Sequence, residues 1–239
     1  MNILLIQPSY YVDSIKHKKW RQLFPLLTMP TIAAYTPPGH KVEIVDDFTE
    51  EVDYNVPCDL IGITALTVNA KRAYDIADEY RKRGKTVIMG GIHVSALPEE
   101  ALEHCDSIVK GEAEFCWAEA VNDFENGKLK RIYKNDFLHD MKGLPVPRYE
   151  LLKTKTILSA VTLETTRGCP FNCDFCCVTQ FYGKIFRFKP VDEVIDQIKY
   201  IKKIYRPGRF IFVDDNITAV RSHAEEIFEK LIPLKIKWS

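Results

Sequence analysis

Short apolar segments, each followed by turn residues, alternate with helical patterns in this sequence, and this alternation limits the fold more than any other feature. Segments this short are typical of strands buried on both faces of a parallel sheet. We expect such strands at residues 2–6, 41–45, 60–64, 86–89 and 107–109. Helices are expected between them, at residues 26–35, 69–83, 98–104 and 112–126. The pattern predicts an α/β fold with a doubly wound, Rossmann-like parallel sheet over residues 1–127.

A second α/β region follows residues 128–159, where the periodicity fades and which we interpret as a linker. Beyond this linker, strands are expected at residues 160–165 and 209–213, and helices at 191–205 and 219–231. A further strand is expected to begin at residues 235–238, so the sequence stops where a strand starts. Residues 160–239 are therefore predicted to form only the first part of a second domain.

Charge and cysteine content narrow the class of protein. The 33 lysines and arginines balance the 33 aspartates and glutamates, which gives no support for a nucleic-acid partner held by bulk charge. No segment approaches the roughly 20 apolar residues that span a bilayer, and the N-terminus lacks the basic start of a signal peptide. We therefore expect a cytoplasmic protein without a membrane span. Four of the 7 cysteines fall in one short stretch, which favours metal or redox chemistry over a disulfide framework.

That stretch contains the spacing C-x3-C-x2-C, formed by Cys169, Cys173 and Cys176. Three thiolates on one tight loop can hold three irons of a cubane cluster, whereas a usual cubane has four cysteine ligands. The fourth iron is then open to the nitrogen and oxygen donors of a small molecule, as a catalytic zinc site keeps one position open. Cys177 falls outside the spacing and is expected to be a small buried residue.

Three other readings of these cysteines remain. A zinc site could use Cys173 and Cys176, although no nearby histidine supplies a further ligand. A thioredoxin-like pair would normally start a helix early in its fold, without a third cysteine. Inert buried cysteines are also compatible with the sequence, but four of them rarely lie so close together.

The segment from Cys169 to Cys176, with Phe175 just before the third cysteine, resembles the signature of radical S-adenosylmethionine (radical SAM) enzymes. The resemblance implies a [4Fe-4S] cluster on the three cysteines and bound S-adenosyl-L-methionine, which is cleaved reductively to a 5′-deoxyadenosyl radical. It also implies that Phe175 flanks the adenine and that Asp214, Asp215 and Asn216 contact the methionyl ammonium. The alternative reading of Asp214 and Asp215 is a polar turn that caps the helix expected at residues 219–231.

The expected strands of the first domain end in residues that suit a ligand site, because open α/β sheets bind ligands beyond the carboxyl ends of their strands. These residues are Gln7, Pro8, Thr64, Leu66, Thr67, Gly90, Gly91, His93, Gly111 and Glu112. The ordered set resembles the cobalamin-binding domain that precedes many radical SAM domains. The Asp-x-His-x-x-Gly motif is absent, so the resemblance implies cobalamin without a histidine on cobalt, and His93 as a polar loop residue lining the pocket.

Together, the two resemblances imply a cobalamin-dependent radical SAM enzyme of the class B methyltransferase type, in which residues 160–239 form the N-terminal part of a (β/α) barrel. The expected reaction is methyl transfer to an unreactive carbon of a small-molecule substrate, with a reductant such as flavodoxin or ferredoxin. The substrate itself is not readable from the sequence. The alternatives are a radical SAM enzyme whose first domain binds no cobalamin, and a non-catalytic fragment that binds a cluster or cofactor.

Overall fold

The computed structural model describes residues 1–10, 27–135, 137–153 and 159–239 of the chain. These residues fall into two compact units, Met1–Asp136 and Phe137–Ser239, and each is described by itself. None of the helices in the described ranges has the length and apolar character needed to cross a membrane.

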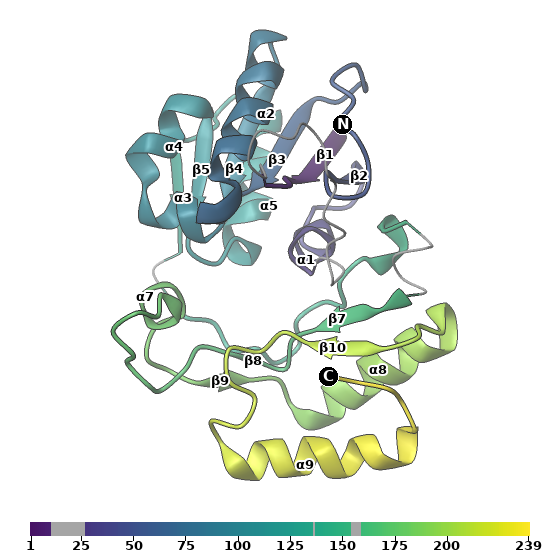
Figure 1. Ribbon diagram of the computed structural model, residues 1–239. Helices are drawn as coiled ribbons and strands as arrows, with labels where there is room; N and C mark the ends of the chain where they lie inside the picture. The colour runs from purple at the N-terminus through teal and green to yellow at the C-terminus, as the bar shows by residue number, and fades with distance from the viewer. Residues whose placement is uncertain (11–26, 136, 154–158) are drawn as a thin grey trace. The chain divides into compact units, whose positions relative to one another are not determined.

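The first unit is built on a six-stranded sheet in which every neighbouring pair is parallel (Figure 1). Its spatial order is β2-β1-β3-β4-β5-β6. The strands are β1 (Asn2–Gln7), β2 (Lys41–Asp46), β3 (Leu60–Thr64), β4 (Thr86–Gly90), β5 (Ser107–Lys110) and β6 (Ile132–Lys134). The order reverses between β1 and β3, so the doubly wound α/β prediction is confirmed.

Helices cover both faces of this sheet, which explains why its central strands are apolar without alternation. The helices are α1 (Thr28–Ala34), α2 (Ala70–Lys82), α3 (Ile92–Ala96), α4 (Pro98–His104) and α5 (Glu114–Glu125). Leu4 and Ile61 share a buried core with residues of α2 and α4. On the other face, a Cβ atom at Gly62 would lie 3.0 Å from the ring of Trp117 on α5. Gly62 therefore leaves the space that the indole ring fills.

Helix α1 begins after the start expected for it, and Leu26 of that expectation lies outside the described residues. Strand β6 was not predicted and lies within the segment interpreted as a linker. It pairs with β5 through Ile108↔Ile132, Val109↔Tyr133 and Lys110↔Lys134. Only the middle residue of this short edge strand, Tyr133, is buried, so the segment carries almost no apolar pattern. The domain bounds themselves remain a prediction.

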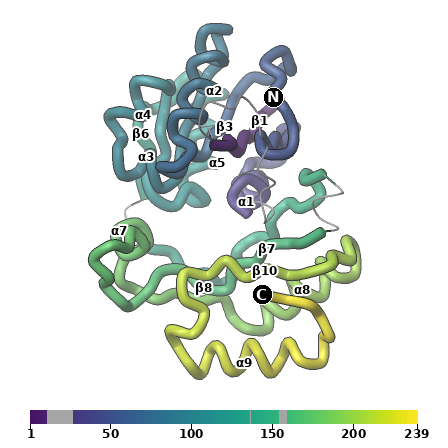
Figure 2. The backbone as a smooth tube through the Cα atoms, in the orientation of Figure 1, coloured from purple at the N-terminus to yellow at the C-terminus, as the bar shows by residue number. Residues whose placement is uncertain are grey.

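The second unit contains a parallel strand pair, β7 (Val161–Leu163) and β10 (Phe210–Phe212), packed with α8 (Val191–Tyr205) and α9 (Arg221–Leu231). The strand expected at residues 160–165 ends earlier and is followed by β8 (Thr166–Arg167), which pairs antiparallel with β9 (Arg187–Phe188). Neither β8, β9 nor α7 (Val178–Tyr182) was predicted. At residues 235–238 the described chain forms only an isolated parallel bridge, Phe210↔Trp238. Figure 2 follows the backbone from β8 through α7, and Figure 1 labels β9, where this segment ends.

Candidate cofactor sites

The three cysteines of the C-x3-C-x2-C spacing lie on the loop that connects β8 to β9. All three thiols are free; Cys173 is exposed, and Cys169 and Cys176 are half-buried. The N–H of Cys176 donates to the carbonyl of Cys173 at 3.0 Å, which closes a tight turn between these two cysteines. Cys177 is exposed directly before α7, so the prediction that it is buried was wrong.

The donor set suits a cubane cluster. Within the described ranges, no three histidine, cysteine, aspartate or glutamate side chains gather around a point where one metal ion could sit. A cubane does not need this arrangement, because each cysteine binds a different iron. Three free thiols on one accessible loop therefore meet its requirement.

Gly168 directly precedes Cys169 and has a backbone conformation with φ of 80°. A Cβ atom at this position would lie 2.5 Å from the carbonyl oxygen of Ile185, which is closer than real Cβ contacts. Only glycine combines the positive φ with this close approach of the two ends of the loop.

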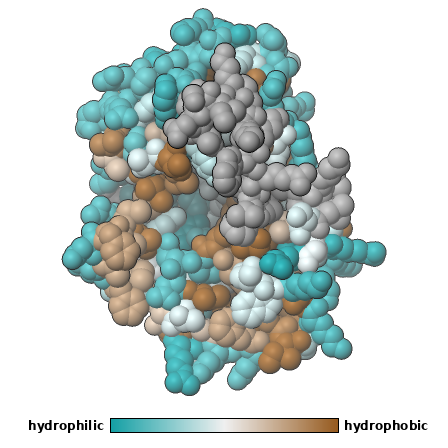
Figure 3. Space-filling model, in the orientation of Figure 1, coloured by the Kyte–Doolittle hydropathy of each residue, from teal (hydrophilic) through white to brown (hydrophobic). Residues whose placement is uncertain are grey.

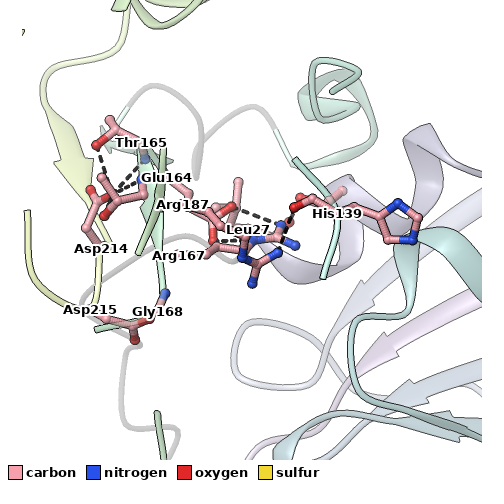
Figure 4. Close-up of polar contacts among 11 residues, drawn as sticks. Leu27, His139, Glu164, Thr165, Arg167, Gly168, Arg187, Asp214 and Asp215 are labelled. Atoms are coloured by element: carbon pink, nitrogen blue, oxygen red, sulfur yellow. Dashed lines mark hydrogen bonds and ion pairs between the residues drawn. The ribbon is translucent and has the colours of Figure 1, made fainter. Parts of the chain in front are cut away.

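The carboxylate of Asp214, just beyond β10, is bonded to the residues around the start of β8. Its Oδ1 accepts hydrogen bonds from the Thr165 N–H at 2.8 Å and hydroxyl at 2.9 Å. It also accepts from the Thr166 hydroxyl at 2.7 Å and from the Thr166 N–H. Figure 4 shows the carboxylate facing Thr165. Burial raises the pKa of Asp214, and these four hydrogen bonds oppose that increase.

The next two residues also reach the cysteine loop. Asp215 accepts a hydrogen bond from the Gly168 N–H at 3.0 Å (Figure 4). The amide nitrogen of Asn216 lies 4.0 Å from the Sγ of Cys169. Helix α9 begins only at Arg221, and its N-cap residue Val220 makes no side-chain capping bond. The reading of Asp214 and Asp215 as helix caps was therefore wrong, because the helix starts too far along the chain.

A partly buried ion pair lies next to the cysteine loop. Arg167 donates from Nε to Glu164 Oε1 at 2.7 Å and from Nη2 to Oε2 at 3.0 Å (Figure 4). On the paired strand β9, Arg187 donates to the carbonyl of His139 at 3.0 Å. These bonds anchor the Arg167 side chain of β8 to the residue two before this strand, and the Arg187 side chain of β9 to the segment that contains His139.

The part of the cysteine loop beyond Gly168 exposes apolar side chains to solvent. Phe175 is 92% exposed, and Phe171 and Ile185 are also exposed. None of the residues of α7 is buried, and apolar side chains lie at the surface in the region of this helix (Figure 3). Phe175 is thus free to lie against a flat apolar group such as an adenine.

In the first unit, the carboxyl ends of β3 and β4 are joined by backbone contacts. Ala65 N–H donates to Gly90 O at 2.8 Å, and His93 N–H donates to Ala65 O at 3.1 Å. Gly91 has a φ of 104°, and a Cβ atom there would lie 2.6 Å from the Ala65 carbonyl. Of the other predicted ligand-site residues, Gln7, Thr64 and Glu112 are buried, and Leu66 is exposed.

His93 lies in α3 and is buried, so it is not the loop residue that was expected. Its Nδ1 lies 3.2 Å from the Thr67 hydroxyl, and its Nε2 lies 3.3 Å from a Glu100 carboxylate oxygen. Both ring nitrogens therefore have protein partners.

Asn69 was not singled out by sequence reasoning, although it links the two strand ends at the point where the strand order reverses. Its side chain is 2% exposed; the Nδ2 donates to the Pro8 carbonyl at 3.0 Å, and the Oδ1 accepts from the Leu66 N–H at 2.7 Å. Asparagine at the expected start of a helix carries no signal for such a bridge, because capping is the usual role of this residue there.

A second missed contact lies beyond β1 and β2. Arg72 on α2 donates from Nε to Asp47 Oδ2 at 2.8 Å and from Nη2 to Oδ1 at 2.9 Å. The Ser9 hydroxyl also donates to Asp47, at 2.6 Å. Burial alone would raise the pKa of Asp47, but the donors of Arg72 and Ser9 outweigh it and hold the pKa below its ordinary value.

Comparison with known proteins identifies both regions. The B12 binding domain family matches residues 30–120, and the Radical SAM superfamily matches residues 163–237. The fold and the cysteine loop therefore define a B12-binding domain followed by a radical SAM domain. The chain thus combines a region of the B12 binding domain family with a region of the Radical SAM superfamily.

Two curated relatives come from Chlorobaculum tepidum. Bacteriochlorophyllide d C-8(2)-methyltransferase is 37% identical over 205 residues, which are 80% of this chain and 46% of that protein. Bacteriochlorophyllide d C-12(1)-methyltransferase is 34% identical over 187 residues, which are 76% of this chain and 41% of that protein. The chain thus spans about half the length of these relatives.

Two solved structures share the fold. TsrM, a radical S-adenosylmethionine methyltransferase from Kitasatospora setae solved with cobalamin and a [4Fe-4S] cluster bound, has a TM-score of 0.69 and 16% identity. The match covers 98% of this chain and 51% of that chain. OxsB, a cobalamin-dependent S-adenosylmethionine radical enzyme, has a TM-score of 0.71 and 18% identity, over 99% of this chain and 38% of that one.

Proposed function

We propose that the protein is a cobalamin-dependent radical SAM methyltransferase that methylates an unreactive carbon of a small molecule. The observation that carries this proposal is the three-cysteine loop within the matched radical SAM region, preceded by the matched B12-binding region. Three relatives above 30% identity are methyltransferases, which supports methyl transfer over other radical reactions.

In the second unit, Cys169, Cys173 and Cys176 would hold the [4Fe-4S] cluster. The exposed ring of Phe175 would flank the adenine of S-adenosyl-L-methionine, and the turn Asp214-Asp215-Asn216 would supply acceptors for the methionyl ammonium. When bound, the cluster and S-adenosyl-L-methionine supply a radical that activates the substrate carbon, and cobalamin supplies the methyl group. The protein's own part is to position these groups and exclude water.

In the first unit, the carboxyl ends of the strands would line the cobalamin site. The proposed lining comprises Gln7, Pro8, Thr64, Leu66, Thr67, Gly90, Gly91, His93, Gly111 and Glu112. Gly91 permits the close backbone approach of neighbouring segments at this edge. Both nitrogens of His93 have protein partners, which supports a cobalt ion without a histidine ligand.

Reductive cleavage needs an electron from outside the chain. A flavodoxin or ferredoxin would supply it, and the free cysteines suit the cytoplasm, where thiols stay reduced. This partner and this location are part of the proposal.

The test is anaerobic reconstitution with iron, sulfide and hydroxocobalamin, followed by gel filtration and addition of S-adenosyl-L-methionine and dithionite. The expected result is retained corrin absorbance and release of 5′-deoxyadenosine. A loaded cluster with cleavage but no retained corrin would indicate a radical SAM enzyme without cobalamin. A loaded cluster that releases no 5′-deoxyadenosine would indicate a non-catalytic cluster-binding protein.

A further inference from the structure

All four residues that directly precede Cys169 are held by carboxylates. Asp214 binds Thr165 and Thr166, Glu164 binds Arg167, and Asp215 binds Gly168. Two of these carboxylates come from the end of β10, which is distant in sequence from the loop. The start of the cysteine loop is therefore attached to the segment that follows β10, a strand of a different sheet from β8.

Asp214 makes the densest of these contacts. One of its oxygens accepts both the backbone and the hydroxyl donors of two consecutive threonines. Thr165 and Thr166 are buried, so these bonds are shielded from water. Hydrogen bonds to a carboxylate are stronger than neutral ones, and burial makes their loss costly. The other oxygen, Oδ2, is buried without a hydrogen-bond partner among the described residues.

The start of the cysteine loop is fixed by contacts, whereas its tip is exposed. At its start, Gly168 is pressed against the Ile185 carbonyl and bonded to Asp215. At its tip, Cys173 and Phe175 are exposed. A rigid start lowers the entropy that is lost when three thiolates close on a cluster, because fewer backbone angles remain to be ordered.

We propose that Asp214 is a positioning residue for the cysteine loop. It acts on the cluster indirectly, through its hydrogen bonds to Thr165 and Thr166. This inference rests on the proposed function and divides the roles within the acidic turn. Asp214 orients the loop, while the exposed carboxylate of Asp215 and the amide of Asn216 remain to meet the methionyl ammonium.

The test compares Asp214→Ala and Asp214→Asn with Asp192→Ala, which removes an exposed carboxylate of α8 that bonds Lys230 in the same unit. Hydrogen–deuterium exchange of the cluster-free protein is measured over residues 165–169, and iron and sulfide are counted after anaerobic reconstitution. Asp214→Ala should speed exchange there about tenfold or more and lower iron content about threefold, because buried donors lose a charged acceptor. Asp214→Asn keeps an acceptor oxygen and should retain most of the iron, and Asp192→Ala should match the wild type.

The affinity for S-adenosyl-L-methionine separates positioning from direct contact. In protein reconstituted with its cluster, Asp214→Asn should change the affinity for S-adenosyl-L-methionine by less than about twofold. Asp215→Asn should weaken this affinity about tenfold while retaining iron. If Asp214→Asn keeps its iron but loses affinity like Asp215→Asn, or if Asp214→Ala leaves exchange and iron unchanged, the proposal is overturned.

If Asp214→Ala does not fold, Thr166→Val replaces it: removal of one of four donors should speed exchange about two- to threefold, and no change would contradict the proposal. If the wild type takes up no cluster, the proposed function fails, but exchange in the cluster-free protein still decides whether Asp214 orders the loop.

Discussion

Gly168 shows how a single residue determines the entry to the cysteine loop. Its positive φ turns the chain into Cys169, and its missing side chain lets the Ile185 carbonyl approach. Gly143, in the same unit, has a φ of 70°, but a Cβ atom there would meet no atom within 4 Å among the described residues. Replacing Gly143 with alanine would therefore incur only the cost of the backbone conformation, whereas replacing Gly168 would add the cost of a steric clash.

We predict that Gly168→Ala destabilises the second unit by about 2–4 kcal/mol, because the left-handed conformation and the clash with Ile185 both oppose it. Gly143→Ala should cost about 1 kcal/mol, since only the conformation opposes it. Urea unfolding of both variants measures the difference. Equal costs would show that the segment around Ile185 moves away without penalty.

Cys173 and Cys177 lie close together in the sequence, so substituting each in turn tests which of them binds the cluster. Cys173→Ala should abolish the brown colour and the charge-transfer absorbance of the reconstituted cluster, because one iron loses its thiolate. Cys177→Ala should leave both unchanged, since Cys177 lies outside the C-x3-C-x2-C spacing. Iron and sulfide analysis measures the outcome. Full loading of Cys173→Ala would contradict the assignment of Cys173 as a ligand.

At the scale of elements, strand ends are connected by polar side chains from other elements. Asp214 connects β10 to β8, and Asn69 connects the segment after β1 to the segment after β3. Asp47 connects the segment after β2 to Arg72 on α2. Each contact lies where strands end and backbone groups would otherwise lack partners. The positions of the loops that form the candidate sites therefore depend on a few buried hydrogen bonds.

The Asp47–Arg72 contact predicts a pH dependence. The folded state holds the pKa of Asp47 below its ordinary value, so the stabilisation is present above about pH 4 and is lost as pH falls through the folded-state pKa. Asp47→Asn should therefore lower the free energy of unfolding by about 2–3 kcal/mol at pH 7 and by much less at low pH.

Urea unfolding at pH 7 and near pH 3 measures this dependence. Asp75→Asn serves as the control, because Asp75 forms an exposed pair with Lys71 at i,i+4 spacing on the same helix. Its cost should stay below about 0.5 kcal/mol at either pH. A deficit of Asp47→Asn that is equally large in acid would mean that the carboxylate charge is not what stabilises the contact.

At the scale of the whole molecule, the two candidate cofactor sites belong to different compact units, each with its own buried strands. Damage to one site should therefore leave the other intact. The B12-binding match lies within the first unit, and the radical SAM match lies within the second.

We predict that Cys173→Ala loses its iron but retains corrin absorbance after gel filtration. Asn69→Ala should do the reverse, because removing its side chain leaves the Leu66 N–H and the Pro8 carbonyl without this partner at the edge proposed for cobalamin. Corrin spectra and iron analysis of both variants provide the measurement. Loss of both cofactors in either variant would show that the two sites depend on each other.

Local sequence patterns were enough to predict five strands of the parallel sheet and four of the helices between them, and they predict the three cysteines as cluster ligands. Buried strands must be apolar and their helices amphipathic, and the ligands of a cluster loop lie close together in the chain, so these features are visible in the sequence. β6 left no such pattern, because only Tyr133 of its three residues is buried. The β8–β9 pair is only two residues long on each side, which is too short for periodicity to reveal.

The roles of the polar residues at the strand ends emerged only from the folded structure. From sequence alone, Asp214 and Asp215 could cap a helix or meet an ammonium, and nothing connected them to Thr165, Thr166 and Gly168. Nor did any pattern connect Asn69 to Pro8 or Arg72 to Asp47. A hydrogen bond between residues far apart in the chain depends on which strands become neighbours, and that pairing is set by packing of the whole sheet.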